Sequence, residues 1–406
     1  FYVKNQSNIF LMHYIMDKIQ LCDKTTCTQC MACVNACPKG CINMVDGGQG
    51  FVVPQIDNTL CVKCGVCMHS CHQLENTLNR YTPIKTLACW TMVDIDRRNS
   101  SSGGAFSVLA RWVLGEDGVV FGATMNKNLQ VYHTSIERVD HLYRLQGSKY
   151  VQSYLGDTFI QVRNHLKQGR LVLFTGTPCQ IGGLLTYLRK KYDNLITCDM
   201  VCHGVPSQRI FNAFCERTHL TGTCDGISFR FTEGWGFQLT RELILPTKVE
   251  NFNSTCVKRK PINPRNAWYM RAFNKSFMFN EACYSCSYAK PERVSDFTMA
   301  DYWGVGRNTP FLHPKHRGVS MLLVNTYRAC EILKELPDFF CEERDLQEAL
   351  EGNFNLSRSS VRPKNRNQFI ADLFDMSKTD IVKRYGLQAD VRDYFRLVKQ
   401  WLIAKR

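Results

Sequence analysis

Apolar residues between positions 118 and 220 follow two alternating patterns. Short apolar runs predict strands at 118–125, 129–136, 170–176 and 194–204, and the third (RLVLFTG) is apolar enough to be buried on both faces. Segments with helical spacing predict helices at 157–169, 177–192 and 206–220, with Asp157 as an N-cap, Gly169 as a stop and Pro178 in the first turn of the second helix. Strands that alternate with helices in this way predict an open α/β sheet with at least one parallel βαβ unit.

The pattern differs toward the two ends of the chain. Cysteines dominate residues 20–80, whereas 327–336, 343–352 and 378–386 are helical in pattern, with a polar, basic connector at 357–368. We expect four parts, namely an N-terminal extension at 1–19, a cysteine-rich module at 20–80, an α/β domain at 85–340 and a helical C-terminal tail at 341–406. No apolar run is long enough for a membrane span, and the first residues do not resemble a signal peptide, so we expect a cytoplasmic protein.

Composition changes this picture mainly through cysteine. The 406 residues include 21 cysteines, and an odd number without a signal peptide argues for metal binding rather than for a disulfide scaffold. The formal net charge of +15 would also suit nucleic acid. However, an oxidised [4Fe-4S] cluster with its four cysteinates carries about −2, and the basic residues are spread along the chain. We therefore expect an acidic redox partner and no nucleic acid.

Two cysteine runs share one spacing, C-x2-C-x2-C-x3-C. The first consists of Cys27, Cys30, Cys33 and Cys37, and the second of Cys61, Cys64, Cys67 and Cys71. This repeat is typical of two-cluster bacterial ferredoxins, in which the fourth cysteine of each run binds the other cluster. One cluster should thus be held by Cys27, Cys30, Cys33 and Cys71, and the other by Cys61, Cys64, Cys67 and Cys37. Zinc knuckles are the alternative, although they lack the crossed fourth ligand.

Two further cysteines of this module, Cys22 and Cys41, lie outside the repeat. We interpret each as a small buried side chain, and leave open that Cys41 replaces one ligand.

Four cysteines of the α/β region form a third candidate set. Cys179 and Cys202 each follow a predicted strand, and Cys283 and Cys286 form an isolated C-x2-C pair that is incomplete by itself. Ligand sites in open α/β sheets gather at the carboxyl ends of strands, so together these residues predict a third [4Fe-4S] cluster. The alternative is that Cys179 is a catalytic nucleophile at a helix N-terminus.

A serine- and glycine-rich turn offers a different kind of site. Ser100–Gly104 leads directly into an amphipathic helix, and its hydroxyls and amides would suit a pyrophosphate, although a simple helix cap explains it equally well. It is neither G-x-G-x-x-G nor a P-loop. Lys149, Tyr150 and Ser153 could contact phosphate and a ring, or form a surface turn.

Six motifs agree in order with one known family. SSSGGAFSVLA, SKYVQS, LFTGTPCQIGGL, DMVCHGVPS, CYSCSYA and SDFTMADYWGVG resemble those of the coenzyme F420 hydrogenase/dehydrogenase beta-subunit family, to which plant 7-hydroxymethyl chlorophyll reductase is also similar. The resemblance covers about residues 87–326. It implies non-covalently bound FAD next to a [4Fe-4S] cluster whose ligands are Cys179, Cys202, Cys283 and Cys286. It also implies flavin contacts at Ser101, Ser102, Gly103, Gly104, Lys149, Tyr150, Ser153, Gly176 and Thr177.

The expected protein is therefore an α+β ferredoxin-like two-cluster module followed by an α/β flavin domain with a partly parallel sheet and a helical tail. We expect an oxidoreductase that passes electrons between three [4Fe-4S] clusters and FAD, with reduced ferredoxin or another redox protein as partner and a small molecule or a deazaflavin as acceptor. The alternative is a non-catalytic electron-transfer subunit of a larger enzyme, and a homo-oligomer is a further expectation. No acid–base pair stands out, and His133 and His203 are either proton-transfer candidates or structural histidines.

Overall fold

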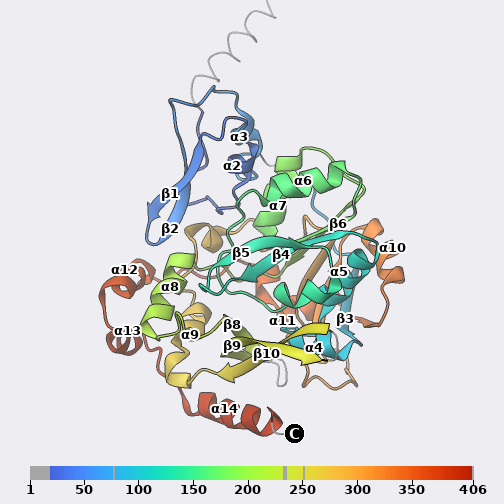
Figure 1. The fold of residues 1–406 in the computed structure, drawn as a ribbon, viewed down its shortest axis with the longest axis vertical. Coiled ribbons are helices and arrows are strands. Elements are labelled where there is room, and N and C mark those ends of the chain that lie inside the picture. Colours follow the sequence, from blue (N-terminus) through green and yellow to red (C-terminus); the bar gives the residue numbers. More distant parts are fainter. Residues whose placement is uncertain (1–18, 76–77, 232–235, 250–251, 405–406) are drawn as a thin grey trace, which may run out of the picture.

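The computed structural model describes residues 19–75, 78–231, 236–249 and 252–404, so nearly all of the expected N-terminal extension lies outside the described residues. The cysteine-rich module forms one end of the molecule and rests on a larger domain built around a mixed sheet (Figure 1). Among the helices described, none combines the length and apolar character that crossing a lipid bilayer requires.

The module consists of one hairpin and two very short helices. The antiparallel strands are β1 (Ile42–Gly48) and β2 (Phe51–Ile56), and the helices are α2 (Ala32–Ala36) and α3 (Val66–His69). The two cysteine runs also share the same backbone conformation around their second cysteine. The residues on either side of Cys30, Gln29 and Met31, have φ values of 58° and 57°, and those on either side of Cys64, Lys63 and Gly65, have values of 53° and 72°. Both loops therefore turn through the left-handed region at equivalent positions.

The larger domain contains an eight-stranded sheet with the order β13-β3-β12-β11-β7-β6-β4-β5. Its strands are β3 (Lys85–Thr91), β4 (Val119–Met125), β5 (Val131–Ile136), β6 (Val172–Thr175), β7 (Leu195–Met200), β11 (Phe297–Asp301), β12 (Ser320–Val324) and β13 (Phe339–Glu343). The four central strands β11, β7, β6 and β4 are parallel, and the outer pairs are antiparallel. The prediction of an α/β domain with a partly parallel sheet is therefore confirmed.

Helices cover both faces of this sheet. On one face lie α5 (Ala105–Gly115) and α10 (Tyr327–Glu335), and on the other α6 (Thr158–Lys167) and α7 (Pro178–Leu188). Val120 packs toward α5, whereas its neighbours Val119 and Phe121 pack toward α6 and α7, and all three are fully buried. Burial on both faces explains why apolar residues occupy successive positions in the central strands.

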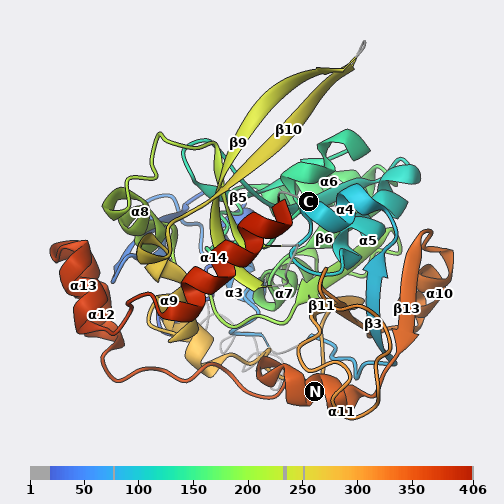
Figure 2. The same ribbon diagram turned by 90° about the horizontal axis from the view of Figure 1, so that it is seen from below.

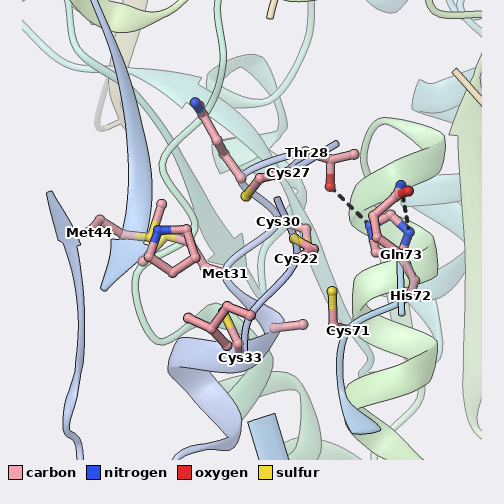
Figure 3. Close-up of a pocket in the computed structure, with 14 residues that line it drawn as sticks. Cys22, Cys27, Thr28, Cys30, Met31, Cys33, Met44, Cys71, His72 and Gln73 are labelled. Carbon is pink, nitrogen blue, oxygen red and sulfur yellow. Dashed lines mark hydrogen bonds between the residues drawn. The ribbon is translucent and has the colours of Figure 1, made fainter. Parts of the chain in front are cut away.

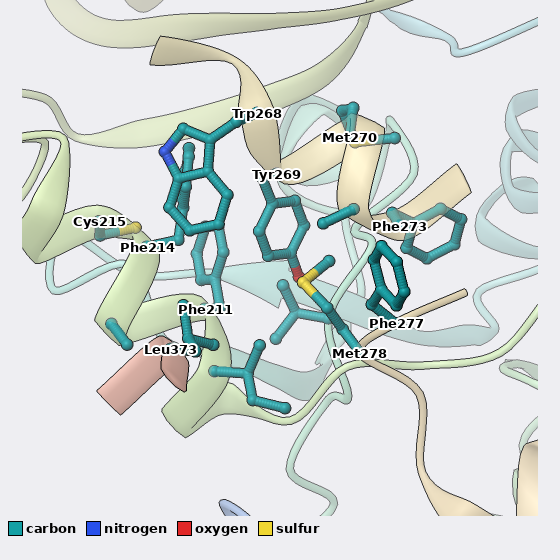
Figure 4. Close-up of a cluster of buried hydrophobic side chains, with 14 of the residues drawn as sticks. Phe211, Phe214, Cys215, Trp268, Tyr269, Met270, Phe273, Phe277, Met278 and Leu373 are labelled. Atoms are coloured by element: carbon teal, nitrogen blue, oxygen red, sulfur yellow. The ribbon is translucent and has the colours of Figure 1, made fainter. Parts of the chain in front are cut away.

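A second core lies beside the sheet. It joins α8 (Gln208–Arg217), α9 (Trp268–Asn274), α12 (Arg366–Asp375) and α13 (Lys378–Arg384) to a three-stranded sheet, β8 (Gly226–Phe231), β9 (Gly236–Val249) and β10 (Phe252–Pro261). Aromatic rings dominate this core (Figure 4). The rings of Phe214 and Trp268, for example, lie 5.1 Å apart in an edge-to-face arrangement. The hairpin β9–β10 projects from the body of the domain, and α14 (Val391–Ala404) lies near its base (Figure 2).

The remaining elements are short. They are α4 (Asp94–Asn99), α11 (Leu346–Gly352) and the 3-10 helices η1 (Val139–Arg144), η2 (Pro264–Asn266), η3 (Glu281–Ser285) and η4 (Phe354–Leu356).

Three features differ from the sequence-based expectations. Helix α7 ends at Leu188, because Arg189 adopts a left-handed φ of 58° that stops the helix before the predicted end at 192. Strand β7 ends at Met200, so Cys202 lies in the following loop. The expected boundary at 340/341 falls inside β13, which pairs with β3 and belongs to the main sheet rather than to a helical tail. Its half-exposed, mixed sequence (FFCEE) is that of an edge strand, whose character depends on its neighbour.

Candidate metal centres

The eight cysteines of the repeat divide between two cavities. One cavity is lined by Cys27, Cys30, Cys33 and Cys71, whose side chains face one another in Figure 3. A second cavity is lined by Cys37, Cys61, Cys64 and Cys67. Each cavity thus combines three cysteines of one run with the fourth of the other, which is the grouping that the crossed pattern predicts.

The walls of each cavity carry thiols, and a [4Fe-4S] cubane separates its four thiolates by its own width, so the cavities fit such a cluster. Among the residues that the structure describes, no three cysteine, histidine or acidic side chains converge closely enough to hold one metal ion.

Backbone amides point at the sulfur atoms. Cys27 accepts a hydrogen bond from the amide of Gln29, Cys30 from that of Ala32 and Cys33 from that of Val34. The left-handed residues around Cys30 produce this orientation, because alternating backbone conformations turn successive N–H groups toward a common centre. Such donors stabilise the negative charge of thiolates and of the cluster that they would hold.

Each cavity also contains a fifth cysteine. Cys22 lines the first cavity and Cys41 the second. The interaction with Cys22 lowers the pKa of Cys27 and lowers that of Cys71 to about 6. The sulfur atoms of Cys41 and Cys37 lie 3.3 Å apart. Cys41 is 3% exposed and packs in a small apolar cluster with Ile42 and Cys67, as expected for a small buried side chain, but both cysteines that the repeat leaves out also stand among the candidate ligands.

The third set of cysteines gathers at the carboxyl edge of the main sheet. Cys179 lies in the first turn of α7, directly after β6, and Cys202 lies two residues after β7. The C-x2-C pair comes from η3 and the residue that follows it. Cys179, Cys202 and Cys286 interact electrostatically with one another, and Cys283 with all three. The fold therefore brings together four thiols that span residues 179 to 286.

Burial sets the character of this third site. It raises the pKa of both Cys179 and Cys202 to about 12, and raises that of Cys283 well above its ordinary range. A thiol that is protonated at neutral pH is a poor nucleophile, which weakens the alternative role for Cys179. Iron binding removes the proton from such a thiol, so the same burial is compatible with a cluster ligand.

A buried ion pair lies beneath this site. Arg293 and Asp199 form a 3.0 Å ion pair, and their side chains are 2% and 0% exposed. The same guanidinium donates to the carbonyl oxygens of Tyr288 and Lys290, just after Cys286, and to that of Met200, just before Cys202. Arg293 therefore connects the loop of Cys202 to the loop of Cys286 by hydrogen bonds, and its positive charge lies near both of these cysteines. Its position after the C-x2-C pair, in AKPERVSDF, is the signal that sequence reasoning missed.

The first cavity and the third site are in direct contact. A Cβ atom on Gly183, one turn along α7 from Cys179, would lie 2.8 Å from the sulfur of Cys30. On the other side, the Tyr288 hydroxyl lies 2.8 Å from Nδ1 of His72, which directly follows Cys71. Tyr288 also interacts electrostatically with Cys30, Cys179 and Cys286, so it stands between the two sets of thiols.

The predicted flavin contacts fall into two groups. In the first, Ser101 Oγ accepts a hydrogen bond of 2.7 Å from the amide of Ser148, which joins the Ser/Gly turn to the segment of Lys149 and Tyr150. Ser102 donates to the carbonyl oxygen of Val319 at 2.8 Å. The N-terminus of α5 begins at Gly104 without a side-chain cap, which leaves its amides available to an anion.

Two residues of this group also have structural tasks that the sequence did not indicate. A Cβ atom on Gly103 would lie 2.3 Å from the carbonyl oxygen of Cys89 and 2.6 Å from the amide of Ser320, so the sheet itself requires glycine here. The Lys149 ammonium donates to three carbonyl oxygens at the end of η1, namely those of Arg144, Leu145 and Gln146. Burial lowers its pKa to about 8.

The second group surrounds Gln180 in the first turn of α7. Gln180 donates to Ser153 Oγ at 3.0 Å and accepts from the amide of Thr177 at 3.0 Å, and Thr177 caps the helix. A Cβ atom on Gly176 would lie 3.0 Å from Gln180 Oε1. This group is next to Cys179, whereas Tyr150 of the first group interacts with Cys202. The serine, lysine and amide donors fit a dinucleotide phosphate, and their proximity to the thiols fits a flavin beside a cluster.

Neither candidate histidine is suited to proton transfer. Burial lowers the pKa of His133 to about 4, and its Nε2 atom lies 2.9 Å from the carbonyl oxygen of Thr175. His203 is half-buried, and desolvation lowers its pKa as well. Both side chains are neutral at physiological pH and pack against aromatic rings, which favours structural roles.

Comparisons with known proteins agree with the sequence analysis at the level of domains. Residues 169–347 match the family model for the C terminus of the coenzyme F420 hydrogenase/dehydrogenase beta subunit, and residues 26–75 match that of the 4Fe-4S dicluster domain. The resemblance to that family is therefore confirmed. A chain of the xenon-derivatised F420-reducing [NiFe] hydrogenase complex from Methanosarcina barkeri is similar at 16% identity and a TM-score of 0.44, over 76% of this chain and 94% of that one. No curated protein matches the chain.

Proposed function

We propose that this chain, an iron–sulfur redox protein with the C-terminal domain of coenzyme F420 hydrogenase/dehydrogenase beta subunits, is a flavoprotein oxidoreductase with three [4Fe-4S] clusters. The observation that carries the proposal is the contact between the first cavity and the third site through Gly183 and Tyr288. Clusters at three neighbouring sets of thiols would provide a route for single electrons, and FAD would exchange those electrons in pairs with an acceptor.

The chain's own residues would hold the flavin at the carboxyl edge of the sheet. Ser101, Ser102 and the uncapped amides after Gly104 would bind the pyrophosphate, with Lys149 supplying positive charge nearby. Ser153 and Thr177, placed by Gln180, would lie nearer to the third cluster. The acceptor in this proposal is a small molecule or a deazaflavin, and the protein works in the cytoplasm, where thiols stay reduced.

Electrons would enter at the second cavity. Cys64 is exposed, and the nearby side chains of Leu60 and Val62 are each 56% exposed. Described residues 19–75 contain three lysines and four acidic residues, so the basic surplus lies outside the module. An apolar contact beside Cys64, rather than the net charge of the chain, would therefore position reduced ferredoxin or another redox protein.

The central test is cofactor content together with a reductive titration of anaerobically purified full-length protein. We expect about twelve irons, one FAD released by acid precipitation, and about five electrons taken up per chain, because each cluster accepts one and FAD two. Protein without flavin, or uptake of only about three electrons, would overturn the flavin part. About eight irons would overturn the third cluster.

A second function is favoured by helix α14. Val391 and Phe395 are each 70% exposed and Val398 is 54% exposed, so an apolar stripe on this helix has solvent on it in the single chain. Such a stripe suits another subunit, and the chain would then feed electrons to a partner enzyme. Reduction of a soluble acceptor by the purified chain favours the enzyme, whereas activity that appears only with a co-purifying subunit favours this second function.

A further inference from the structure

The two ferredoxin cavities each hold five thiols, although a [4Fe-4S] cluster uses four. Cys22 is the fifth thiol of the first cavity and Cys41 that of the second. Cys198 and Cys215 also lie outside the predicted ligand sets, but they are buried in the apolar cores of the larger domain and line neither cavity. Each of the two cavities thus contains one cysteine more than a cluster needs, and one explanation should account for both.

Each fifth thiol lies beside particular ligands. Cys41 Sγ lies 3.3 Å from Cys37 Sγ and also interacts with Cys61. Cys22 lines the first cavity together with Cys27 and Cys71 and interacts with both. Two sulfur atoms in contact can present themselves to the same iron corner, whereas a sulfur on the far side of the cavity cannot.

We propose that Cys22 and Cys41 are exchangeable ligands, Cys22 for the iron corner held by Cys27 or Cys71 and Cys41 for that held by Cys37 or Cys61. The inference rests on the two-cluster module of the proposed function and is independent of the flavin and of the third cluster. It assigns to each cavity one ligand beyond the four of the repeat.

The exchange is balanced without an added reactant. One iron–sulfur bond breaks at the original ligand and one forms at the fifth cysteine, so the iron keeps four sulfur neighbours. The proton of the incoming thiol moves along the existing S–H···S hydrogen bond to the outgoing thiolate. No electron is gained or lost, and the charge of the site is unchanged.

The experiment compares alanine variants of the full-length protein by iron and sulfide content and by electron paramagnetic resonance (EPR) of the reduced clusters. Cys37→Ala is expected to keep the iron content of the wild type with a shifted EPR spectrum, because Cys41 completes the site. Cys37→Ala/Cys41→Ala should lose about four irons. Cys64→Ala is the matched control, and it should lose the same four irons because the proposal assigns Cys41 to the corner held by Cys37 or Cys61 and not to that of Cys64.

The first cavity gives an independent test if a Cys37 variant fails to fold. Cys71→Ala should keep its iron, Cys71→Ala/Cys22→Ala should lose about four, and Cys33→Ala is the control that should lose four without Cys22 being changed. Single Cys22→Ala and Cys41→Ala variants should keep all iron, because in them the original four ligands are intact.

Loss of four irons from both Cys37→Ala and Cys71→Ala, to the level of the double variants, would overturn the proposal. Retention of iron in the double variants would also overturn it, since another group would then be the replacement. The iron content of each variant is compared with that of the wild type. If the third cluster or the flavin is absent, the iron content of the wild type changes but the difference between variant and wild type does not.

Discussion

The ferredoxin module and the sheet domain assemble cysteines by opposite means. In the module, eight candidate ligands lie between residues 27 and 71, and left-handed residues beside Cys30 and Cys64 shape both loops alike. In the sheet domain, Cys179 and Cys202 come together because the parallel strands β6 and β7 end at one edge, and η3 brings Cys283 and Cys286 to them. A local loop motif can be recognised wherever it occurs, whereas a site at strand ends exists only after the sheet has formed.

The two regions also differ in the groups around sulfur. In the module, the sulfur atoms of Cys37 and Cys41 lie 3.3 Å apart and Cys64 is exposed. In the sheet domain, the four cysteines are half-buried, burial raises the pKa of their thiols, and the positive charge of Arg293 partly compensates at Cys202 and Cys286. The exposed thiol suits the module to exchange electrons with partners, and the nearby cation suits the inner site to hold the negative charge of a cluster.

The largest expected effect is a loss of iron from the sheet domain alone, with the iron of the module unchanged. Cys179→Ala should remove about four of twelve irons, because it breaks the inner site and leaves the module intact. Cys179→Ala/Cys283→Ala should lose no more than either single variant, since residues of one site fail as a unit. Iron analysis and EPR provide the measurement. Cys198→Ala, which removes a buried thiol from β7 close to Cys202, is the control and should keep all iron.

The buried ion pair tests how the inner site is held. Arg293→Met should destabilise the domain by about 3–5 kcal/mol, because it leaves the Asp199 carboxylate buried without its cation. The inner cluster should also lose iron faster than the module does. Thermal unfolding and the time course of iron release to a chelator measure the two effects. If Arg293→Met and Asp199→Asn/Arg293→Met are equally unstable, the unpaired carboxylate is not the cause.

The junction between the two regions should respond to a single methyl group. Gly183→Ala places a Cβ atom 2.8 Å from Cys30 Sγ, so the module must shift away from α7. Such overpacking costs about 1–3 kcal/mol. The irons should remain, while electron transfer from the module to the inner cluster slows in freeze-quench EPR. Gly115→Ala, which would meet no atom within 4 Å, is the control. Unchanged transfer in Gly183→Ala would contradict this route.

The smallest expected effect is a pH dependence within the sheet domain. His133 is buried with its pKa lowered to about 4, so the unfolded chain binds more protons below pH 6.5. Neutral His133 makes its full contribution to the free energy of unfolding above pH 6.5, and this contribution is lost as the pH falls toward 4. Between pH 7.5 and 5.5 the loss should be about 1 kcal/mol. Thermal midpoints should therefore fall more in the wild type than in His133→Gln, and equal falls would count against this assignment.

Much of the sheet domain could be predicted from the sequence. Central strands such as β4 and β6 are apolar at successive positions because both faces are covered, and Pro178 marks the start of α7. The edges could not be predicted in the same way. Strand β13 is half exposed and mixed in sequence, so only its pairing with β3 makes it a strand.

For the site, the sequence by itself determined the crossed ferredoxin pattern, because the fixed cysteine spacing sets a loop that wraps one cluster and reaches the next. It also placed Cys179 and Cys202 at strand ends. Only the tertiary structure put Cys22 and Cys41 into the cavities, joined Arg293 to Asp199 and set Tyr288 against His72. The physical reason is separation along the chain. Cysteine spacing encodes a loop that can be recognised in the sequence, whereas a contact such as that of Tyr288 with His72, which lies 216 residues earlier, depends on how whole elements pack.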